Sequence, residues 1–298
     1  MQRGAKGIYS LFALTAHCSQ LIARRLDSLD NHCMKSSPWQ RRIQRAEKLA
    51  NEYSFASEIL SFYINVARFQ EDLYKRLESE SEKAIGSAHS PSGPPERKTL
   101  IGSFGPFLVL VEKHAPASLA AIARELRASS SKSWSELLDE SWSPSESADA
   151  PEQFLARALL QPYAELLRVR SEMKSDGYTH ALCPFCGRKA GLGVLRPQGD
   201  GASRFLMCSF CLAEWEFRRI LCPNCDEQDN SKLPVYTASD FDYIRVECCD
   251  TCKTYIKSVD LSKNGLAEPI VDEIAAAPLD LWAQQHGYSK LQLNLMGM

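Results

Sequence analysis

Apolar residues recur at the spacing of an α-helix through most of the first 177 residues. From Trp39 to Leu77 they advance in steps of three and four residues along two adjacent stripes. One stripe comprises Leu49, Tyr53, Ala56, Leu60, Tyr63, Ala67, Gln70, Tyr74 and Leu77, and the other comprises Ile59, Phe62, Val66, Phe69 and Leu73. Because two stripes make a wide apolar face, the segment is predicted to be helical and to pack inside a bundle.

The same helical pattern continues in shorter pieces. It returns from Leu108 to Arg127, where Pro116 predicts a new helix start at Ala117. Further helices are predicted around residues 134–140 and over residues 152–174, and Gly177 ends the latter. Ser79 to Lys98 is rich in Ser, Pro and Gly at its centre, which predicts a long loop. Shorter loops are predicted at residues 129–133 and 141–150.

After Tyr178 the helical pattern gives way to short strand-like segments. These segments are residues 204–207, 213–217, 243–247 and 254–259, and residues 272–287 are helical in pattern again. The predicted fold class is therefore α plus small metal-binding β modules. An N-terminal all-α helical domain precedes two rubredoxin-like or zinc-ribbon modules, and a helical tail follows them.

Composition narrows the class of protein. The 298 residues are 44% apolar and 24% charged, and 35 Lys and Arg stand against 37 Asp and Glu, which is typical of a globular protein. No apolar run approaches the roughly 18 residues that span a bilayer. Ile8 to Ala16 is too short and interrupted for a convincing export signal, so residues 1–38 are predicted to begin with an amphipathic helix and the protein to be cytoplasmic.

The cysteines are the main chemical signal, because 9 of the 11 fall between residues 183 and 252. Eight form four C-x-x-C motifs, namely Cys183 with Cys186, Cys208 with Cys211, Cys222 with Cys225, and Cys249 with Cys252. Two intervening residues let both thiolates reach one metal ion from a tight turn. Gly187, directly after the first motif, suits a turn that needs a positive φ.

Sequential pairing of the motifs predicts two sites with four sulfur ligands each. The intervals between paired motifs are 21 residues (187–207) and 23 residues (226–248), about one hairpin each. Such a site accepts iron or zinc. Cys248 is interpreted as a spare thiol, although a shifted turn would use it in place of Cys249, and His180 is interpreted as a surface residue rather than a ligand.

Other functions are less consistent with the sequence. The first motif alone resembles a dithiol redox site, but no helix is predicted to follow it. From Tyr178 onward, 12 Lys and Arg are outnumbered by 15 Asp and Glu, which argues against nucleic-acid binding. No phosphate-binding loop, H-E-x-x-H or G-x-S-x-G motif occurs, and a metal held by four thiolates has no open position, so no enzyme activity is predicted.

The residues around these motifs resemble those of the FdhE family of formate dehydrogenase accessory proteins. The matching stretches lie in the cysteine region, the tail and two helices. They are residues 183–187, 204–215, 219–225, 246–257 and 278–287, with residues 60–63, 67–70 and 160–167 in the helices. The resemblance covers roughly residues 39–298, whereas residues 1–38 have no match in it.

The resemblance implies a non-catalytic maturation factor that acts in the cytoplasm. Its expected partner is the catalytic subunit of respiratory formate dehydrogenase, with no nucleic acid, no membrane span and a possible homodimer. It implies iron, with zinc as the alternative, in two sites whose ligands are Cys183, Cys186, Cys208, Cys211, Cys222, Cys225, Cys249 and Cys252. The alternatives are a stand-alone rubredoxin-type electron-transfer protein and a zinc-ribbon protein that binds nucleic acid.

These interpretations divide the chain into five parts. Residues 1–38 form an N-terminal helix of uncertain extent, and residues 39–177 form the helical domain. Residues 178–217 and 218–270 form the first and second metal modules, and residues 271–298 form the tail.

The two-site interpretation predicts how bound metal divides between the modules. Changing Cys183 and Cys186 to Ser should remove about half of the metal and leave the helical domain folded, because a small metal module depends on its own ion for folding. Metal analysis and circular dichroism of the variant test this. Loss of all the metal, or of none, would contradict the sequential pairing.

Overall fold

The computed structural model of this chain describes residues 37–83, 94–143, 150–171 and 177–297. Contacts divide the chain into two units, Met1–Arg41 and Arg42–Met298. In the first unit the described residues open helix α2 (Pro38–Glu52), where the Ser37 hydroxyl accepts from the Gln40 N–H at 3.1 Å and the Gln40 side chain accepts from the Ser37 N–H at 3.2 Å. This reciprocal capping starts the helix. The predictions for residues 1–36 lie outside the described residues.

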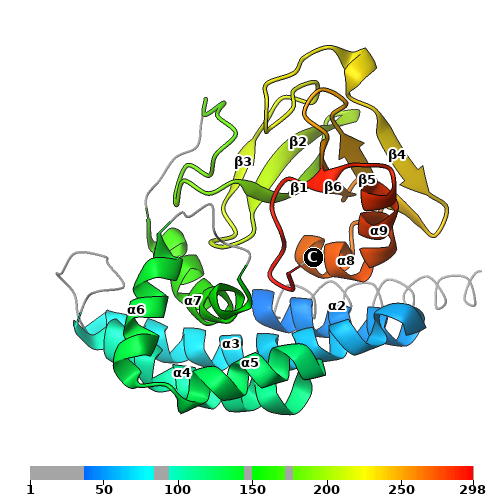
Figure 1. Cartoon of the computed structure of the whole chain (residues 1–298). Coiled ribbons are helices and arrows are strands. Elements are labelled where there is room, and N and C mark those ends of the chain that lie inside the picture. Colours follow the sequence, from blue (N-terminus) through cyan, green and yellow to red (C-terminus); the bar gives the residue numbers. More distant parts are fainter. Residues whose placement is uncertain (1–36, 84–93, 144–149, 172–176, 298) are drawn as a thin grey trace, which may run out of the picture. The chain divides into compact units, whose positions relative to one another are not determined.

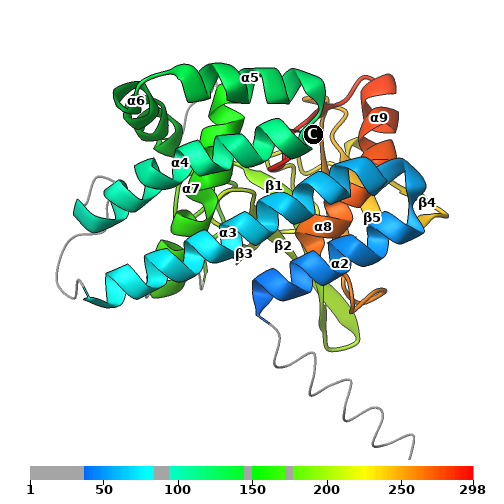
Figure 2. The ribbon, with the colours of Figure 1, turned by 90° about the horizontal axis from the view of Figure 1, so that it is seen from below.

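Helices α3 to α7 form a layer in the second unit (Figure 1). Their bounds are Ser57–Lys83 for α3, Pro94–His114 for α4, Ala117–Ala128 for α5, Ser131–Trp142 for α6 and Pro151–Arg170 for α7. Figure 2 shows α3 and α4 running side by side. Phe104, Phe107, Leu159 and Tyr163 are buried in their common core. The predicted helical region is confirmed, including the helix start at Ala117.

Several predicted boundaries in this layer are wrong: α6 includes residues 131–133 and 141–142 of the predicted loops, and α7 ends at Arg170 rather than at residue 174. The stretch from residue 39 to 77 is interrupted by a 3-10 turn, Ser54–Ala56, because the Tyr53 ring packs 5.1 Å from that of Phe241 in the sheet and its backbone is extended. The predicted loop at residues 79–98 is shorter, since α3 continues to Lys83 and α4 begins at Pro94. Ser79 and Lys98 are exposed on these helices, and the Thr99 hydroxyl of α4 donates to the Glu80 carboxylate of α3 at 2.7 Å.

The cysteine region forms one sheet in the order β3-β2-β1-β6-β5-β4, with β7 also beside β6. The strands are β1 (Ala190–Gln198), β2 (Gly201–Cys208), β3 (Glu214–Glu216), β4 (Val235–Ala238), β5 (Phe241–Cys248), β6 (Thr254–Asp260) and β7 (Ser289–Lys290). Strands β1 to β3 pair antiparallel, as do β4 to β6. Parallel pairing of residues 193–195 with residues 258–260 joins the two groups.

The sequence pattern did not predict β1, β4 or the two-residue strand β7. Strand β1 contains Gly191 and Gly193, which weaken the strand signal. The structure explains both glycines by close approach: a Cβ on Gly191 would lie 2.5 Å from the Ser209 Cβ, and one on Gly193 would lie 2.1 Å from the Ser258 Oγ. Strand β4 has only four residues, and these are mostly exposed.

The tail consists of helices α8 (Pro269–Ala275) and α9 (Ala277–Gln285), which confirms the prediction of a helical tail. Val271 and Ile274 of α8 pack into a core with Leu60 and Tyr63 of α3. Leu279 of α9 packs with residues of β5 and β6. Helix α8 thus lies between the helical layer and the sheet (Figure 1). Among the described residues, no helix is both long and apolar enough to cross a membrane.

A buried charge cluster connects the tail to the sheet. The Lys257 ammonium of β6 is fully buried and lies 3.1 Å from the Glu273 carboxylate and 2.5 Å from that of Asp280. Lys290 pairs with the same two carboxylates. Burial raises the pKa of Glu273, but Lys257 and Lys290 outweigh it and hold this pKa at about 2. Removing one partner of such a cluster typically costs about 3–5 kcal/mol, so it fixes the tail in place.

The contact between β1 and β6 generates a prediction about stability. Gly193→Ala should lower the free energy of unfolding by about 1–3 kcal/mol, because its methyl group overlaps Ser258. Adding Ser258→Gly should recover part of that loss by removing the overlapping side chain. Urea unfolding of the single and double variants measures both effects.

Gly102→Ala provides the matched control. Gly102 lies in α4 with open space around its Cβ position, so this change should be neutral or stabilising by up to about 1 kcal/mol. Equal effects of the two Gly→Ala changes would contradict the close approach of β1 and β6.

Candidate metal centres

The four C-x-x-C motifs form the same tight turn. In each, the N–H of the first cysteine donates to the carbonyl five residues later, at 2.7–2.9 Å. The N–H of the residue after the second cysteine donates back to the first cysteine's carbonyl, at 2.9–3.2 Å. The N–H groups of Phe210 and Asn224 also approach the sulfurs of Cys208 and Cys222 at 3.4 Å. Such bonds stabilise negative charge on a thiolate.

The residue after each turn's second cysteine has a positive φ. The angle is 71° at Gly187, 58° at Leu212, 60° at Asp226 and 56° at Lys253. The sequence predicts this conformation at Gly187 alone. A residue with a side chain pays about 1–2 kcal/mol to adopt it, so surrounding interactions must hold the other three turns.

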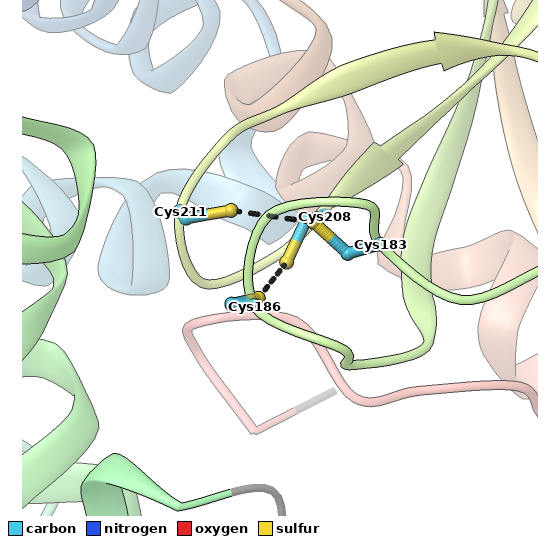
Figure 3. Close-up of side chains that lie close together, drawn as sticks. All are labelled: Cys183, Cys186, Cys208 and Cys211. Atoms are coloured by element: carbon cyan, nitrogen blue, oxygen red, sulfur yellow. Dashed lines mark hydrogen bonds between the residues drawn. The ribbon is translucent and has the colours of Figure 1, made fainter. Parts of the chain in front are cut away.

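The turns meet in the sequential pairs that the spacing predicts. Cys183, Cys186, Cys208 and Cys211 form one group, and Cys222, Cys225, Cys249 and Cys252 form the other, with the sulfurs of each group within 4.8 Å of one another. Figure 3 shows the two turns of the first group facing each other. That these groups hold metal stays a prediction.

The sulfur spacing fits a tetrahedral metal ion. A bond of about 2.3 Å to each thiolate separates the sulfurs by about 3.8 Å. In the first group Cys183 lies 3.5 Å from Cys211 and Cys186 lies 3.4 Å from Cys208, measured between Sγ atoms. In the second group the two corresponding distances are both 3.7 Å. A small relaxation would place iron or zinc at either centre.

The first group is buried against the helical layer. Cys183, Cys208 and Cys211 are buried, and Arg168 of α7 donates from Nε to the Cys211 carbonyl at 2.9 Å. The Phe210 ring in the second turn meets Trp142 of α6 edge to face, with centroids 5.6 Å apart. Hydrogen bonds from Cys183, Cys208 and Cys211 lower the pKa of Cys186, which favours its thiolate form.

Arg188 holds the first turn against the end of α6. Its guanidinium lies 3.9 Å from the Phe210 ring centroid, and its Nη2 donates to the carbonyls of Ser141 and Trp142 at 2.9 and 2.7 Å. These contacts tie the turn to the helix, so this site is fixed from two sides.

The second group is open to solvent. Cys225 is exposed and Cys252 is half-buried. Burial raises the pKa of Cys252, but hydrogen bonds from Thr254 and Asn224 outweigh it and lower this pKa to about 6. The adjoining acidic residues are Asp226, Glu227, Asp229 and Asp250. Negative charge around a thiolate site disfavours phosphate ligands.

The sequence did not predict four residues that position the sites, namely Trp142, Arg168, Arg188 and Thr254. Arg168 and Trp142 lie far from the cysteines in sequence, so only the tertiary structure reveals their roles. Thr254 lies two residues after the fourth motif, with its hydroxyl 3.0 Å from the Cys252 sulfur. His180 belongs to neither group, and its carbonyl accepts from the Trp215 indole at 3.0 Å. Cys248 is buried outside the second group, which includes Cys249.

Known proteins of one family are similar to this chain. Residues 182–219 match a family model described as the FdhE central domain, and residues 220–296 match the FdhE C-terminal domain. An FdhE homolog from Aquifex aeolicus is 30% identical over 253 residues, which cover 82% of this chain and 87% of that protein. One from Pseudomonas putida is 34% identical over 152 residues, covering 48% of this chain and 47% of that protein.

A solved structure also has the same fold. The crystal structure of the FdhE protein from Pseudomonas aeruginosa aligns with a TM-score of 0.63 at 22% identity. The alignment covers 88% of this chain and 97% of that chain. It therefore includes both the helical layer and the sheet.

The unequal burial of the two groups predicts unequal metal release. A thiol-reactive mercurial should release the metal in two phases of about equal size, first from the exposed second group and then from the buried first group. A metal-sensitive dye measures the release. The Cys222→Ser/Cys225→Ser variant should retain only the slow phase, and the Cys183→Ser/Cys186→Ser variant only the fast one. The opposite assignment of phases would contradict this prediction.

Proposed function

Because this chain belongs to the FdhE family, we propose that it is an accessory protein of formate dehydrogenase that binds the enzyme's catalytic subunit during maturation. Family membership is the observation that carries the proposal. The Aquifex aeolicus relative matches along most of both chains, so the similarity is not confined to the cysteine turns.

The chemistry of the two cysteine groups supports a binding role without catalysis. A metal ion with four thiolate ligands has no open coordination position for a substrate. The main buried charge cluster is occupied internally, because Lys257 and Lys290 already pair with Glu273 and Asp280. In this proposal the protein acts through its contact surfaces, and the metal ion at each site holds one pair of turns in shape.

Iron is the proposed metal, with zinc as the alternative. The sulfur spacing accepts either ion. Iron in such a site supplies one-electron chemistry, whereas zinc is redox-inert. Metal analysis and the visible absorption spectrum of anaerobically purified protein distinguish the two, since four-thiolate ferric iron is coloured and zinc is not.

Two alternative functions make different predictions. A rubredoxin-type carrier would use the exposed second group to exchange electrons, and would show a reversible midpoint with turnover in a reductase assay. The acidic residues beside that group, such as Asp226 and Glu227, oppose a nucleic-acid-binding role. Helices α3 to α7 provide far more surface than electron transfer needs, which favours the binding role.

The proposed site of action is the cytoplasm. The resemblance to the FdhE family implies a maturation factor that acts there. Fractionation of cells with an antibody against this chain tests the proposed location.

The proposed function predicts the phenotype of a deletion strain. Cells that lack this protein should contain formate dehydrogenase polypeptide but little formate oxidation, because maturation fails after synthesis. Immunoblotting and a formate oxidation assay measure these two quantities. Purified protein should also retain the catalytic subunit in a pull-down.

Cysteine variants in the deletion strain test whether the second cysteine group is needed for this function. Cys222→Ser/Cys225→Ser should fail to restore activity, because the second turn pair loses its metal. Cys18→Ser/Cys33→Ser is the matched control, since these two cysteines belong to none of the four C-x-x-C motifs, and it should restore activity. Normal formate oxidation in the deletion strain, with no detectable subunit binding, would contradict the proposed function.

A further inference from the structure

A small cavity lies beside the second cysteine group, on the sheet face that includes Glu247 of β5 and Val235 of β4. Its volume is about 190 Å³, and Cys222 and Cys249 border it. The apolar part of its wall consists of Leu195, Leu221, Leu233, Ile256 and Leu291. Pockets for cofactors and other small ligands usually have about 300–1,000 Å³. This cavity has the size to take a single side chain rather than a cofactor.

Two exposed apolar residues also line this cavity. Ile220 is 48% exposed and Val235 is 54% exposed. Large apolar side chains that surround a pocket are typical of protein contacts, where an anchoring side chain of the partner fills the pocket. Strand β4 is also at the edge of the sheet, so an extended segment added along it would place alternate side chains on the cavity's face.

The charged residues of the cavity specify the partner's chemistry. Arg204, Arg219 and Arg245 line it, but Arg245 is already paired with Asp260 at 2.7 Å. Arg204 is 3% exposed and pairs with Glu247 at 2.7 Å, but its Nε has no hydrogen-bond partner among the described residues. Arg219 is exposed and makes no ion pair with any described residue. An acidic group would therefore find an available cation at the cavity.

We infer that this cavity receives one large apolar side chain from an extended, acidic segment of the partner protein, with a carboxylate of that segment beside Arg219. The inference rests on the proposed function, because it names the surface that holds the partner. The apolar wall supplies burial for the anchor, and Arg219, the lining arginine without an ion pair among the described residues, selects for a neighbouring negative charge.

A capped peptide, acetyl-Val-Glu-Phe-Glu-Val-amide, is the probe for the first experiment. Calorimetry with the full metal-loaded chain should detect its binding. Replacing Phe with Ala should weaken binding at least about tenfold, because an aromatic side chain loses its burial. Replacing both Glu with Lys should also weaken it. Equal affinity for all three peptides, or no binding of the first, would overturn the inference.

Adjacent and matched residues provide the protein variants. Arg219→Gln should weaken binding of the acidic peptide by about two- to fivefold, the range for an exposed ion pair. Arg218→Gln is its control, since Arg218 does not line the cavity and donates to Gln228 at 3.1 Å. Ile220→Glu should weaken binding more strongly, through lost apolar contact and charge repulsion. Leu266→Glu is its control, because Leu266 is 73% exposed and does not line the cavity.

Measuring how strongly the same variants of this chain bind the catalytic subunit separates this inference from the proposed function. Weaker subunit binding by Ile220→Glu, but not by Leu266→Glu, would support the inference. If Ile220→Glu binds the subunit as well as the unmodified chain does, the inference is wrong and the proposed function stands. If the peptides discriminate as expected but the unmodified chain does not bind the subunit, the chemistry of the cavity is supported and the proposed function is contradicted.

Discussion

Two groups of four sulfur atoms, closely spaced within each group, are the constraint on which the sheet region depends. Four thiolates at such distances repel one another, so a cation or shared protons must compensate their charge. The backbone forms the same two hydrogen bonds in all four turns. The N–H of the first cysteine donates to the carbonyl five residues later, and the carbonyl of that cysteine accepts from the residue after the second cysteine. Leu212, Asp226 and Lys253 adopt a left-handed conformation to complete the turns, although glycine would adopt it at lower cost.

The sheet then makes the two sulfur groups parts of one structure. Strands β1 and β6 pair in parallel, and the glycine at position 193 leaves room for Ser258. Lys257, the residue before Ser258, carries its charge into the interior and meets the tail's carboxylates there. The sheet that carries both cysteine groups therefore contacts the tail, and α8 of the tail shares a core with α3.

The two groups nevertheless have different surroundings. The first is fixed by Arg168, Arg188 and the aromatic contact with Trp142, which suits a structural role. The second leaves Cys225 exposed and lies beside the cavity that contains Arg204 and Arg219. A partner bound at that cavity would cover part of the second group. Metal binding and partner binding would then be thermodynamically linked, because each would change the free energy of the other binding step.

The sequence by itself determined the helical region, the tail and the pairing of the cysteine motifs. These features depend on local periodicity and on the reach of a two-residue turn, which are properties of neighbouring residues. It also identified the family, because the residues around the turns are distinctive. Strand β1 escaped prediction, since its glycines are required by Ser209 and Ser258, which are distant in sequence.

Only the tertiary structure decided how these parts meet. The break at Tyr53 depends on Phe241, and the burial of Lys257 depends on Glu273 and Asp280. The unequal exposure of two similar cysteine groups depends on which of them faces α6 and α7. Each of these outcomes is set by contacts between residues far apart in the chain, where burial and charge compensation outweigh local preference.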